Sequence, residues 1–311
     1  MKRFYLFLIE VLTYVSVAAQ SDYSRQFTDF FETGDSLQLK QILQEWEKHS
    51  LPSPEFYSAW VNYYYKFGRH ETYIKKDPIK VYSAKQLKST EGLFVVGTDD
   101  TETLSVPNET ALVKKIVWNE SFFQKALEYN SKGIELFPLR LDLRLEKFSL
   151  YYELEDYEKS IESLLEIGDA ESKKEKPWMV AYNVQLSEDE STSIIIGICE
   201  MVFDDLMQIS HYKSIQRSEV LAEGMLKHYP DNFVLRFKMG ELLMTKKPDK
   251  ALDILLPLLK EQPDNYDVMF KVALIYKGKG NKGEVKKYYK ILSSCGNEFL
   301  ENMAGFMLRD F

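Results

Sequence analysis

Apolar residues recur at helical spacing along most of the chain, in segments divided by short polar or proline-containing turns. Asp35-Ser36 is a suitable N-cap for a helix that reaches Lys48, with an apolar side formed by Leu37, Leu39, Ile42, Leu43 and Trp46. Pro54 suits the start of the next helix, because its missing N–H would have no partner in a first turn. The pattern therefore predicts helices, of degenerate repeat type, over 20–67.

The second of these helices, at 56–67, is unusually rich in aromatic residues. At helical spacing one face carries Phe56, Trp60, Tyr64 and Phe67, and Tyr57, Tyr63 and Tyr65 cannot all lie on that face. The favoured interpretation is packing against neighbouring repeats on both sides of the helix. The alternative is an exposed aromatic platform for a peptide or a sugar.

The helical pattern stops between 68 and 119. Within this stretch Leu93-Phe94-Val95-Val96 is β-prone, Gly97-Thr98-Asp99-Asp100 is a turn signal, and Thr103 to Val106 could pair back. The pattern predicts an irregular insertion that could contain a β-hairpin. Excursions of this kind in a repeat protein usually lie on one face and often carry function.

Helical spacing resumes over 120–169, stops in a connector at 170–187, and continues over 188–297. The connector is charged up to Pro177, and Trp178 to Leu186 then alternates like a strand that could pair with the earlier insertion. Short polar starts suited to helix capping occur at Asp231-Asn232, Asp249 and Asp264-Asn265. Residues 298–311 are predicted to form a terminal capping helix.

A repeat is visible in the last third of the chain. Pro230 and Pro263 each end a helical run, and Ala251 and Val285 occupy matching points inside such runs. Both pairs give a period of about 33–34 residues, which is typical of stacked helical hairpins, each too small to bury its apolar face alone.

The segment from Phe233 to Asn297 resembles two tetratricopeptide repeats. That family keeps large apolar residues, a small residue and an aromatic in the first helix, then a small residue, an aromatic and a final proline in the second. The matching positions are Met239, Gly240, Leu243, Ala251, Leu255 and Pro263 in one unit, and Val272, Ala273, Tyr276, Val285, Tyr289 and Leu292 in the next. Asn297 stands where the second unit would have its proline. The resemblance implies an all-α, tetratricopeptide-like solenoid, with weaker units at 24–67, 121–168 and 190–230.

Two packing expectations follow from this register. Gly240 and Ala251 should let paired helices approach closely, while Leu243, Leu255, Tyr276 and Tyr289 fill the space between units. Pro257 interrupts the second helix of the first unit, where it removes one hydrogen bond and costs about 3 kcal/mol unless the helix kinks.

In the family, first-helix side chains line the concave groove. The register places eight residues there: Val234, Phe237, Glu241, Met244, Asp267, Phe270, Leu274 and Lys277. Some members hold a terminal carboxylate with a Lys/Asn/Arg set, but Phe237, Glu241, Phe270 and Leu274 occupy the corresponding positions. A groove of this composition favours an apolar segment of a partner.

The first nineteen residues have the pattern of a secretory signal peptide. Lys2 and Arg3 form a basic start, Phe4 to Val17 is mostly apolar, and Val17-Ala18-Ala19 precedes a cleavage point at Gln20. Glu10 is unusual inside such a segment, and an amphipathic first helix is the alternative. Export to the periplasm or the extracellular space of a bacterial envelope is the prediction, with no integral membrane span after the leader.

Composition narrows the range of partners. The chain is 45% apolar and 14% aromatic, which is ample for a core, and its formal charge is −8. An acidic chain without a basic stripe argues against nucleic acid as a partner. The only cysteines, Cys199 and Cys295, lack the spacing of a zinc site, and two buried free thiols are the favoured state.

No catalytic residue, cofactor or metal site is predicted. Gly278-Lys279-Gly280-Asn281-Lys282-Gly283 has dinucleotide-loop spacing, but it follows a helix and fits the turn of a repeat. The four histidines are scattered, and Asp99-Asp100 with Glu102 has too few spaced oxygens for a calcium loop.

Taken together, these features predict an exported, non-enzymatic helical-repeat scaffold that binds a protein or peptide partner in the cell envelope. A glycan-binding accessory protein of nutrient uptake is the alternative, and it requires exposed tyrosines within 57–65. A hydrolase built on the irregular insertions ranks last, because no constellation in the sequence supports it.

Overall fold

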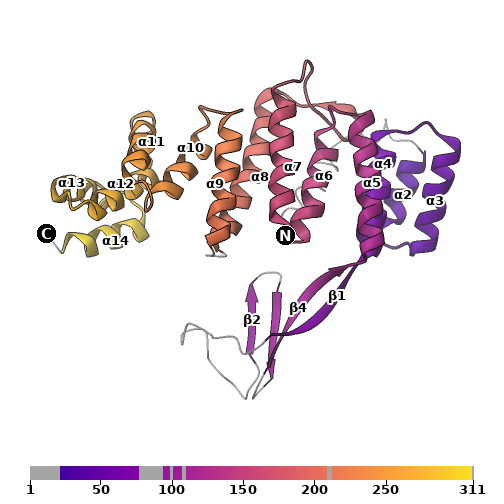
Figure 1. The fold of residues 1–311 in the computed structure, drawn as a ribbon, viewed down its shortest axis with the longest axis horizontal. Helices are drawn as coiled ribbons and strands as arrows, with labels where there is room; N and C mark the ends of the chain where they lie inside the picture. Colours follow the sequence, from indigo (N-terminus) through magenta and orange to yellow (C-terminus); the bar gives the residue numbers. More distant parts are fainter. Residues whose placement is uncertain (1–21, 77–93, 99–100, 107–109, 209–211, 310–311) are drawn as a thin grey trace. The chain divides into compact units, whose positions relative to one another are not determined.

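The computed structural model describes residues 22–76, 94–98, 101–106, 110–208 and 212–309, so the proposed leader lies outside the described residues. Helices dominate, as predicted: thirteen α-helices and two small antiparallel sheets are found in the described part of the chain. The chain divides into two compact units, coloured from indigo to magenta and from magenta to yellow in Figure 1. Unit 1 comprises residues up to 163 together with 176–187, and unit 2 comprises 164–175 and 188 onward.

Unit 1 consists of helical hairpins whose first helices pack side by side. Its helices are α2 (Asp22–Phe31), α3 (Ser36–His49), α4 (Pro54–Gly68), α5 (Glu120–Leu136), α6 (Leu141–Glu153) and the start of α7 (Tyr157–Glu171). The predicted starts are confirmed, because the Asp35 side chain accepts a hydrogen bond from the Gln38 N–H and Pro54 occupies the first turn of α4. The Ser53 side chain caps α4 by accepting from the Phe56 N–H.

Helices α4 and α5 form a single hairpin although the whole segment 69–119 separates them in the sequence. The indole of Trp60 stacks on the ring of Tyr129, with centroids 4.9 Å apart. Gly133 lies so close to α4 that an added Cβ would come within 2.9 Å of Tyr57 Cβ. The Asn119 N–H donates to the Gly68 carbonyl at 2.7 Å and closes the base of the excursion between the two helices. The insertion therefore occupies the turn of one hairpin.

The insertion forms a four-stranded antiparallel sheet in the order β1-β4-β3-β2, which extends from the ends of α4 and α5 (Figure 1). The strands are β1 (Arg69–Lys76), β2 (Phe94–Thr98), β3 (Thr101–Val106) and β4 (Thr110–Trp118). The predicted hairpin is confirmed by the pairing of Val95 with Leu104 and of Val96 with Thr103. The outer pair, in which Arg69 lies opposite Trp118, was not predicted.

The connector after α7 differs from its prediction. Instead of pairing with the insertion, β5 (Met179–Val180) pairs with β6 (Val184–Gln185) across the short 3-10 helix η2 (Ala181–Asn183). The Met179 N–H donates to the Leu139 carbonyl at 2.9 Å, which attaches the connector to the start of α6. Trp178 is fully buried. The segment interpreted as a strand thus forms a tight loop that is held on unit 1 by the burial of Trp178 and by the hydrogen bond to Leu139.

Unit 2 contains the more regular hairpins. Its helices are α8 (Glu188–Gln208), α9 (Tyr212–Leu226), α10 (Phe233–Leu243), α11 (Pro248–Glu261), α12 (Tyr266–Gly278), α13 (Lys282–Leu292) and α14 (Glu298–Leu308), with the last turns of α7. Asn232, Asn265 and Asn281 each cap a helix with their side-chain oxygen. The expected cap at Asp249 is wrong, because α11 begins at Pro248 and Asp249 lies in its first turn.

The repeat register is confirmed by the packing between α10 and α11. A Cβ added at Gly240 would come within 2.5 Å of the Leu255 side chain, and Leu255 and Ala251 are fully buried. Tyr289 is also fully buried, while Leu243 and Tyr276 pack at the edge of the same core. Pro257 lies inside α11, which continues through it to Glu261.

The glycine-rich stretch at 278–283 is the turn between α12 and α13, with Gly280 at φ 72°, as expected of an inter-helix turn.

The two cysteines were predicted to be buried free thiols. Both are free, but only Cys199 is buried and Cys295 is half-buried. Burial raises the pKa of the Cys199 thiol to about 12, so it remains protonated at neutral pH.

Candidate functional site

Seven of the eight predicted groove residues lie on α10 and α12, the first helices of consecutive hairpins in unit 2, and Met244 is the C-cap of α10. Asp267 and Lys277 are exposed, and the other six are partly exposed: Val234, Phe237, Glu241, Met244, Phe270 and Leu274. Phe237, Met244 and Phe270 also pack against the core of this unit. The Lys277 ammonium contacts Met307 Sδ on the terminal helix α14, so the end of this face is already in contact with the chain itself.

An ion-pair ladder crosses this face. Lys238 Nζ on α10 lies 2.8 Å from Asp204 Oδ1 on α8 and 3.6 Å from Glu241 Oε2. Lys271 Nζ on α12 lies 2.6 Å from Glu241 Oε1. Burial alone would lower the pKa of Lys238, but its hydrogen bond to Asp204 and the charge of Glu241 raise it. The ladder joins three first helices, α8, α10 and α12, and contains two positive and two negative charges. The face therefore carries no net charge at these positions.

Unit 1 contains a cavity of about 270 Å³ between its first helices, closed on one side by the connector. One wall is apolar and comes mainly from α2 and α3, with Phe27, Phe31 and Trp46. Another part of the lining is polar and charged, with Glu55 of α4, Arg140 and Asp142 at the start of α6, and Tyr182 of η2. The cavity is therefore a product of residues from five separate segments of the sequence.

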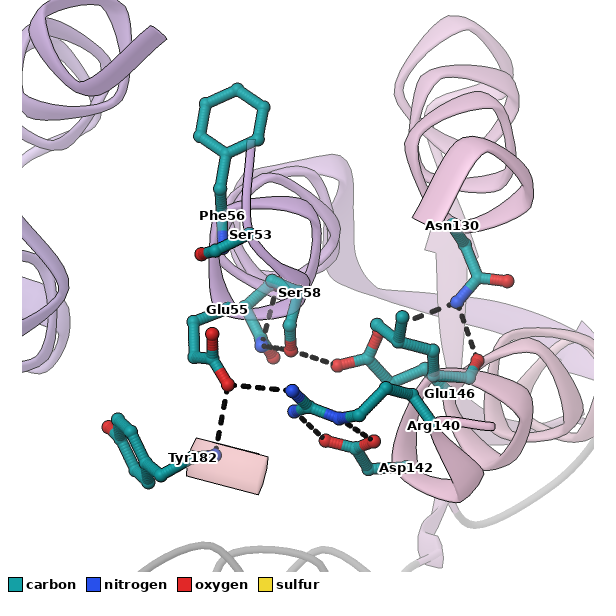
Figure 2. A network of polar contacts seen from close by, with 11 residues as sticks. Ser53, Glu55, Phe56, Ser58, Asn130, Arg140, Asp142, Glu146 and Tyr182 are labelled. Atoms are coloured by element: carbon teal, nitrogen blue, oxygen red, sulfur yellow. Dashed lines mark hydrogen bonds and ion pairs between the residues drawn. The ribbon is translucent and has the colours of Figure 1, made fainter. Parts of the chain in front are cut away.

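A buried ionic network forms the charged wall (Figure 2). The Arg140 guanidinium, 1% exposed, donates from Nη1 to Glu55 Oε1 at 2.7 Å. It also makes a two-pronged contact with Asp142, from Nε to Oδ1 at 2.9 Å and from Nη2 to Oδ2 at 2.6 Å. Glu55 Oε1 accepts a further hydrogen bond from the Tyr182 N–H at 2.9 Å. Arg140 thus joins α4 to α6, and Glu55 joins α4 to the connector.

The charged forms of this network are favoured. Burial alone would raise the pKa of Glu55, but the charge and hydrogen bond of Arg140, with the Tyr182 N–H, lower it. Burial likewise works against the Arg140 cation, but its hydrogen bonds and charge contacts with Asp142 and Glu55 raise its pKa. Both carboxylates also lie in first helical turns, where the helix dipole stabilises negative charge.

A third carboxyl group lies next to the network. Glu146 of α6 is hydrogen-bonded to Ser58 Oγ, a residue of the cavity wall, and lies 3.4 Å from Asn130 Nδ2. Part of Glu146 remains accessible to solvent, but loss of hydration around its carboxyl group raises its pKa to about 8. Asp142 adds to this rise, and the hydrogen bonds from Ser58 and Asn130 oppose it. Glu146 is therefore mostly protonated at neutral pH.

The connector supplies backbone strain at the cavity. Tyr182 has φ 59° and ψ 28°, a left-handed conformation that is uncommon for a residue other than glycine. Asn183 follows with φ 59°. Such conformations persist only where surrounding contacts hold them, and the Glu55 carboxylate supplies one through the Tyr182 N–H.

The structure also brings together a serine, a histidine and an aspartate in unit 2, which the sequence did not reveal. His228 Nδ1 lies 2.7 Å from Ser172 Oγ, and His228 Nε2 lies 3.0 Å from Asp169 Oδ1. The Ser172 side chain is exposed at the end of α7 and also contacts the Gly168 carbonyl. His228 is packed so closely that a Cβ at Gly168 would meet its ring at 2.6 Å. These contacts attach the end of α9 to the end of α7 and give His228 a structural role.

Other chemistry is limited within the described residues. No group of three or more His, Cys, Asp or Glu side chains there is placed to hold a metal ion. None of the helices in that part of the chain combines the length and apolar character needed to cross a membrane. The aromatic helix does not present a platform, because Tyr57, Tyr63 and Tyr65 are all at most 7% exposed. The exposed tyrosines required by the glycan-binding alternative are thus contradicted.

No protein-family model and no curated protein matches the chain. Among solved structures it is similar to YrrB, a tetratricopeptide repeat protein with an unusual peptide-binding site, at 14% identity and a TM-score of 0.38. That match covers 60% of this chain and 84% of YrrB. A tetratricopeptide repeat protein from Parabacteroides merdae ATCC 43184 is similar at 12% identity and a TM-score of 0.28, over 92% of this chain and 98% of that one.

The assignment of fold class rests on the chain's own geometry. Consecutive hairpins in unit 2 repeat the predicted register, with Gly240 against Leu255 and asparagine caps at the start of α10, α12 and α13. The chain has a tetratricopeptide-like helical-hairpin fold with a small antiparallel sheet inserted in one hairpin.

Proposed function

We propose that this chain is an exported, non-enzymatic scaffold that binds an apolar segment of a protein partner in the cell envelope. The first-helix face of unit 2, defined by the eight groove residues on α10, its C-cap and α12, is the proposed contact surface. The ion-pair ladder carries this proposal, because Lys238 and Lys271 are already compensated by Asp204 and Glu241. A neutral face with partly exposed Val234 and Leu274 favours burial of apolar side chains over capture of a charged terminus.

Support for export comes from the sequence of residues 1–19, with its basic start, apolar stretch and Val17-Ala18-Ala19 ending. Processing at this point would give a mature chain that begins at Gln20. Mass spectrometry of the protein from fractionated source cells measures both features. A mature N-terminus at Gln20 in the envelope fraction is expected, and an intact leader in the cytosolic fraction would contradict export.

The contact surface can be tested with a photo-crosslinking amino acid placed at matched pairs of positions. Leu274 on α12 is paired with Ile291 on α13, and Val234 on α10 with Val220 on α9. The second member of each pair is an exposed apolar residue on a second helix, outside the proposed face. Adducts of discrete mass are expected in source cells at positions 274 and 234, and they should decrease when untagged protein competes.

Equal adduct yields at first-helix and second-helix positions would show that apolar exposure, and not this face, determines contact. The absence of adducts at all four positions would count against the scaffold role. The non-enzymatic part has its own check at Ser172, the most enzyme-like residue of unit 2. Ser172→Ala should change the stability of the α7–α9 contact and leave the adduct pattern intact.

A further inference from the structure

The cavity in unit 1 is bounded by more negative than positive charge. Glu32, Glu55 and Asp142 contribute three carboxylates to its walls, and Arg140 contributes one guanidinium. That guanidinium is already shared, because it binds Glu55 and Asp142 together. A single cation between the buried Asp142 and the partly buried Glu55 leaves one negative charge uncompensated in a region of reduced dielectric, where charge interactions are stronger than in water.

The rim already binds one ammonium group of the chain itself. Lys66 Nζ donates to the carbonyl oxygens of Phe31 and Glu32, and it lies 4.8 Å from the centroid of the Phe31 ring. Lys66 reduces the negative charge near Glu32, and the cavity keeps a net charge of −1 when Lys66 is counted with its walls. The contact also shows that carbonyl oxygens and an aromatic face at this rim have the geometry to hold an ammonium ion.

The apolar wall complements this charge. Phe27 and Trp46 are buried, and Ala59 extends the apolar surface along α4 towards Ser58. The volume of about 270 Å³ lies just below the range of roughly 300–1,000 Å³ typical of pockets for drug-sized ligands. A space of this size suits a single extended side chain with an apolar stem and a charged end.

From the charge, the walls and the volume of this cavity, we infer that it binds an alkylammonium group whose hydrocarbon stem packs on Phe27, Phe31 and Trp46. The ammonium end lies towards Glu55 and Asp142, where it compensates the charge left over by Arg140. A lysine side chain of a peptide and a free aliphatic amine share this chemistry. The site shares no residue with the unit 2 face and does not depend on the proposed partner there.

Isothermal titration calorimetry of the full chain tests the inference with four small ligands. Nα-acetyl-lysine N-methylamide represents a peptide side chain, and 1,5-diaminopentane represents a free amine. Nα-acetyl-norleucine N-methylamide keeps the stem without the charge, and Nα-acetyl-glutamate N-methylamide reverses the charge. The lysine compound is expected to bind at least about tenfold tighter than the norleucine compound, because its charge gains hydrogen bonds to carboxylates. Tighter binding of the diamine than of the lysine compound would identify a free amine as the ligand type.

Variants locate the binding within the cavity. Glu55→Gln keeps an acceptor for the Tyr182 N–H but removes a charge, and it should weaken binding of the lysine compound about tenfold or more. Glu32→Gln changes only the exposed rim and should weaken binding roughly two- to fivefold. Thr28→Asp adds a carboxylate at an exposed lining position and should tighten binding by a similar factor. Glu47→Gln makes the same charge change outside the cavity and should have no effect.

Near-ultraviolet circular dichroism shows whether Glu55→Gln folds. If it does not fold, the surface variants Glu32→Gln, Thr28→Asp and Glu47→Gln still decide the test. Equal binding of the lysine and norleucine compounds would overturn the inference and reduce the cavity to an apolar pocket. Preference for the glutamate compound would assign the site to anions through Arg140 and would also overturn it. A lack of binding at millimolar ligand, or equal effects of Glu32→Gln and Glu47→Gln, would contradict the inference as well.

Discussion

The first-helix faces of the two units share an architecture and differ in where they keep their charges. In unit 1, Arg140 is 1% exposed and makes its ion pairs beside a cavity. The strained connector loop forms part of the cavity lining through Tyr182. In unit 2, Lys238 and Glu241 are about one-sixth exposed, and the ladder extends to the surface of regular hairpins through Asp204, which is 57% exposed, and Lys271, which is 30% exposed. Desolvating a buried ion pair costs several kcal/mol, and this cost is offset only when the geometry of the pair is good. A surface ion pair changes the folding stability little in either direction.

This difference suggests how a repeat fold acquires particular chemistry. Regular hairpins place small residues such as Gly240 at helix contacts and leave the face to generic side chains. In unit 1 the regularity is interrupted twice, by the sheet inserted between α4 and α5 and by the connector that supplies Tyr182. The connector forms part of the cavity wall directly. Specific recognition is therefore expected where the repeat is broken and a loop closes over first-helix side chains.

The largest expected effect comes from Arg140→Met, which tests the unit 1 side of the comparison. It leaves the buried Asp142 and the partly buried Glu55 without their cation, and about 3–5 kcal/mol of stability should be lost in unit 1. Hydrogen exchange followed by mass spectrometry can localise the loss to α4 and α6. Faster exchange confined to unit 2 would contradict the assignment of the network as the main connection between these helices.

A triple variant separates lost attraction from unpaired charge. Arg140→Met combined with Glu55→Gln and Asp142→Asn removes all three charges and should recover part of the stability lost in Arg140→Met. A triple variant less stable than Arg140→Met would mean that packing of the guanidinium, and not charge compensation, dominates at this position.

Gly240→Leu tests the unit 2 side. The added side chain must displace Leu255 at the α10–α11 contact, and a loss of about 1–3 kcal/mol is expected from overpacking. Thermal unfolding should show a melting temperature lower by several degrees. Gly197→Ala is the control, because no atom lies within 4 Å of its added Cβ and alanine favours the interior of α8. That variant should gain up to about 1 kcal/mol, and equal losses in both variants would contradict the register.

The two units also differ in how much of them the sequence predicts. Unit 2 follows local rules, since its period, its small residues and its asparagine starts are all encoded within single hairpins. The contacts of the unit 1 network do not follow from local rules, because Arg140 and Tyr182 lie 85 and 127 positions from Glu55 in the sequence. No periodicity links such distant residues, and nothing in the chain marks them as partners before α4 and α6 are packed together.

The wrong pairing predicted for the connector and the unforeseen ion pairs beside the groove residues have the same origin. Alternation in Trp178 to Leu186 was a correct sign of burial, but pairing direction depends on a tertiary neighbour, and α6 supplied it. The predicted groove residues belong to two consecutive first helices and their ends, yet no local pattern indicates that Glu241 is shared by Lys238 and Lys271. A charged Arg140 at a helix start followed by Asp142 was the one local signal of the missed network.

A smaller effect is expected from Glu146→Gln, and it depends on pH. The pKa of Glu146 is about 8 in the folded protein against an ordinary value of 4.5. Between these two pH values the folded state therefore binds more protons than the unfolded state. The stability contributed by the protonated group is complete below the ordinary pKa, and it is lost as pH rises from there through about 8. Glu146→Gln should remove this loss and be more stable than wild type by about 1–2 kcal/mol at pH 8, with the advantage shrinking towards pH 5.

Thermal unfolding of Glu146→Gln and wild type from pH 5 to pH 9 measures this difference. Glu135→Gln, the same substitution at an exposed position of α5, controls for the loss of one charge. A constant difference between Glu146→Gln and wild type across the series would mean that Glu146 is ionised throughout. The measurement also bears on the cavity, because Glu146 contacts Ser58 in its wall.

The smallest effect is expected from Glu241→Gln, which breaks the ladder of unit 2. Lys238 keeps its contact with Asp204, and Lys271 is 30% exposed and can be solvated by water. The loss should therefore be about 1 kcal/mol or less and should decrease as salt is added. Denaturant unfolding at low and high salt measures both quantities. A loss as large as that of Arg140→Met would mean that the two faces use charge in the same way, and the contrast between a buried network and a surface ladder would no longer hold.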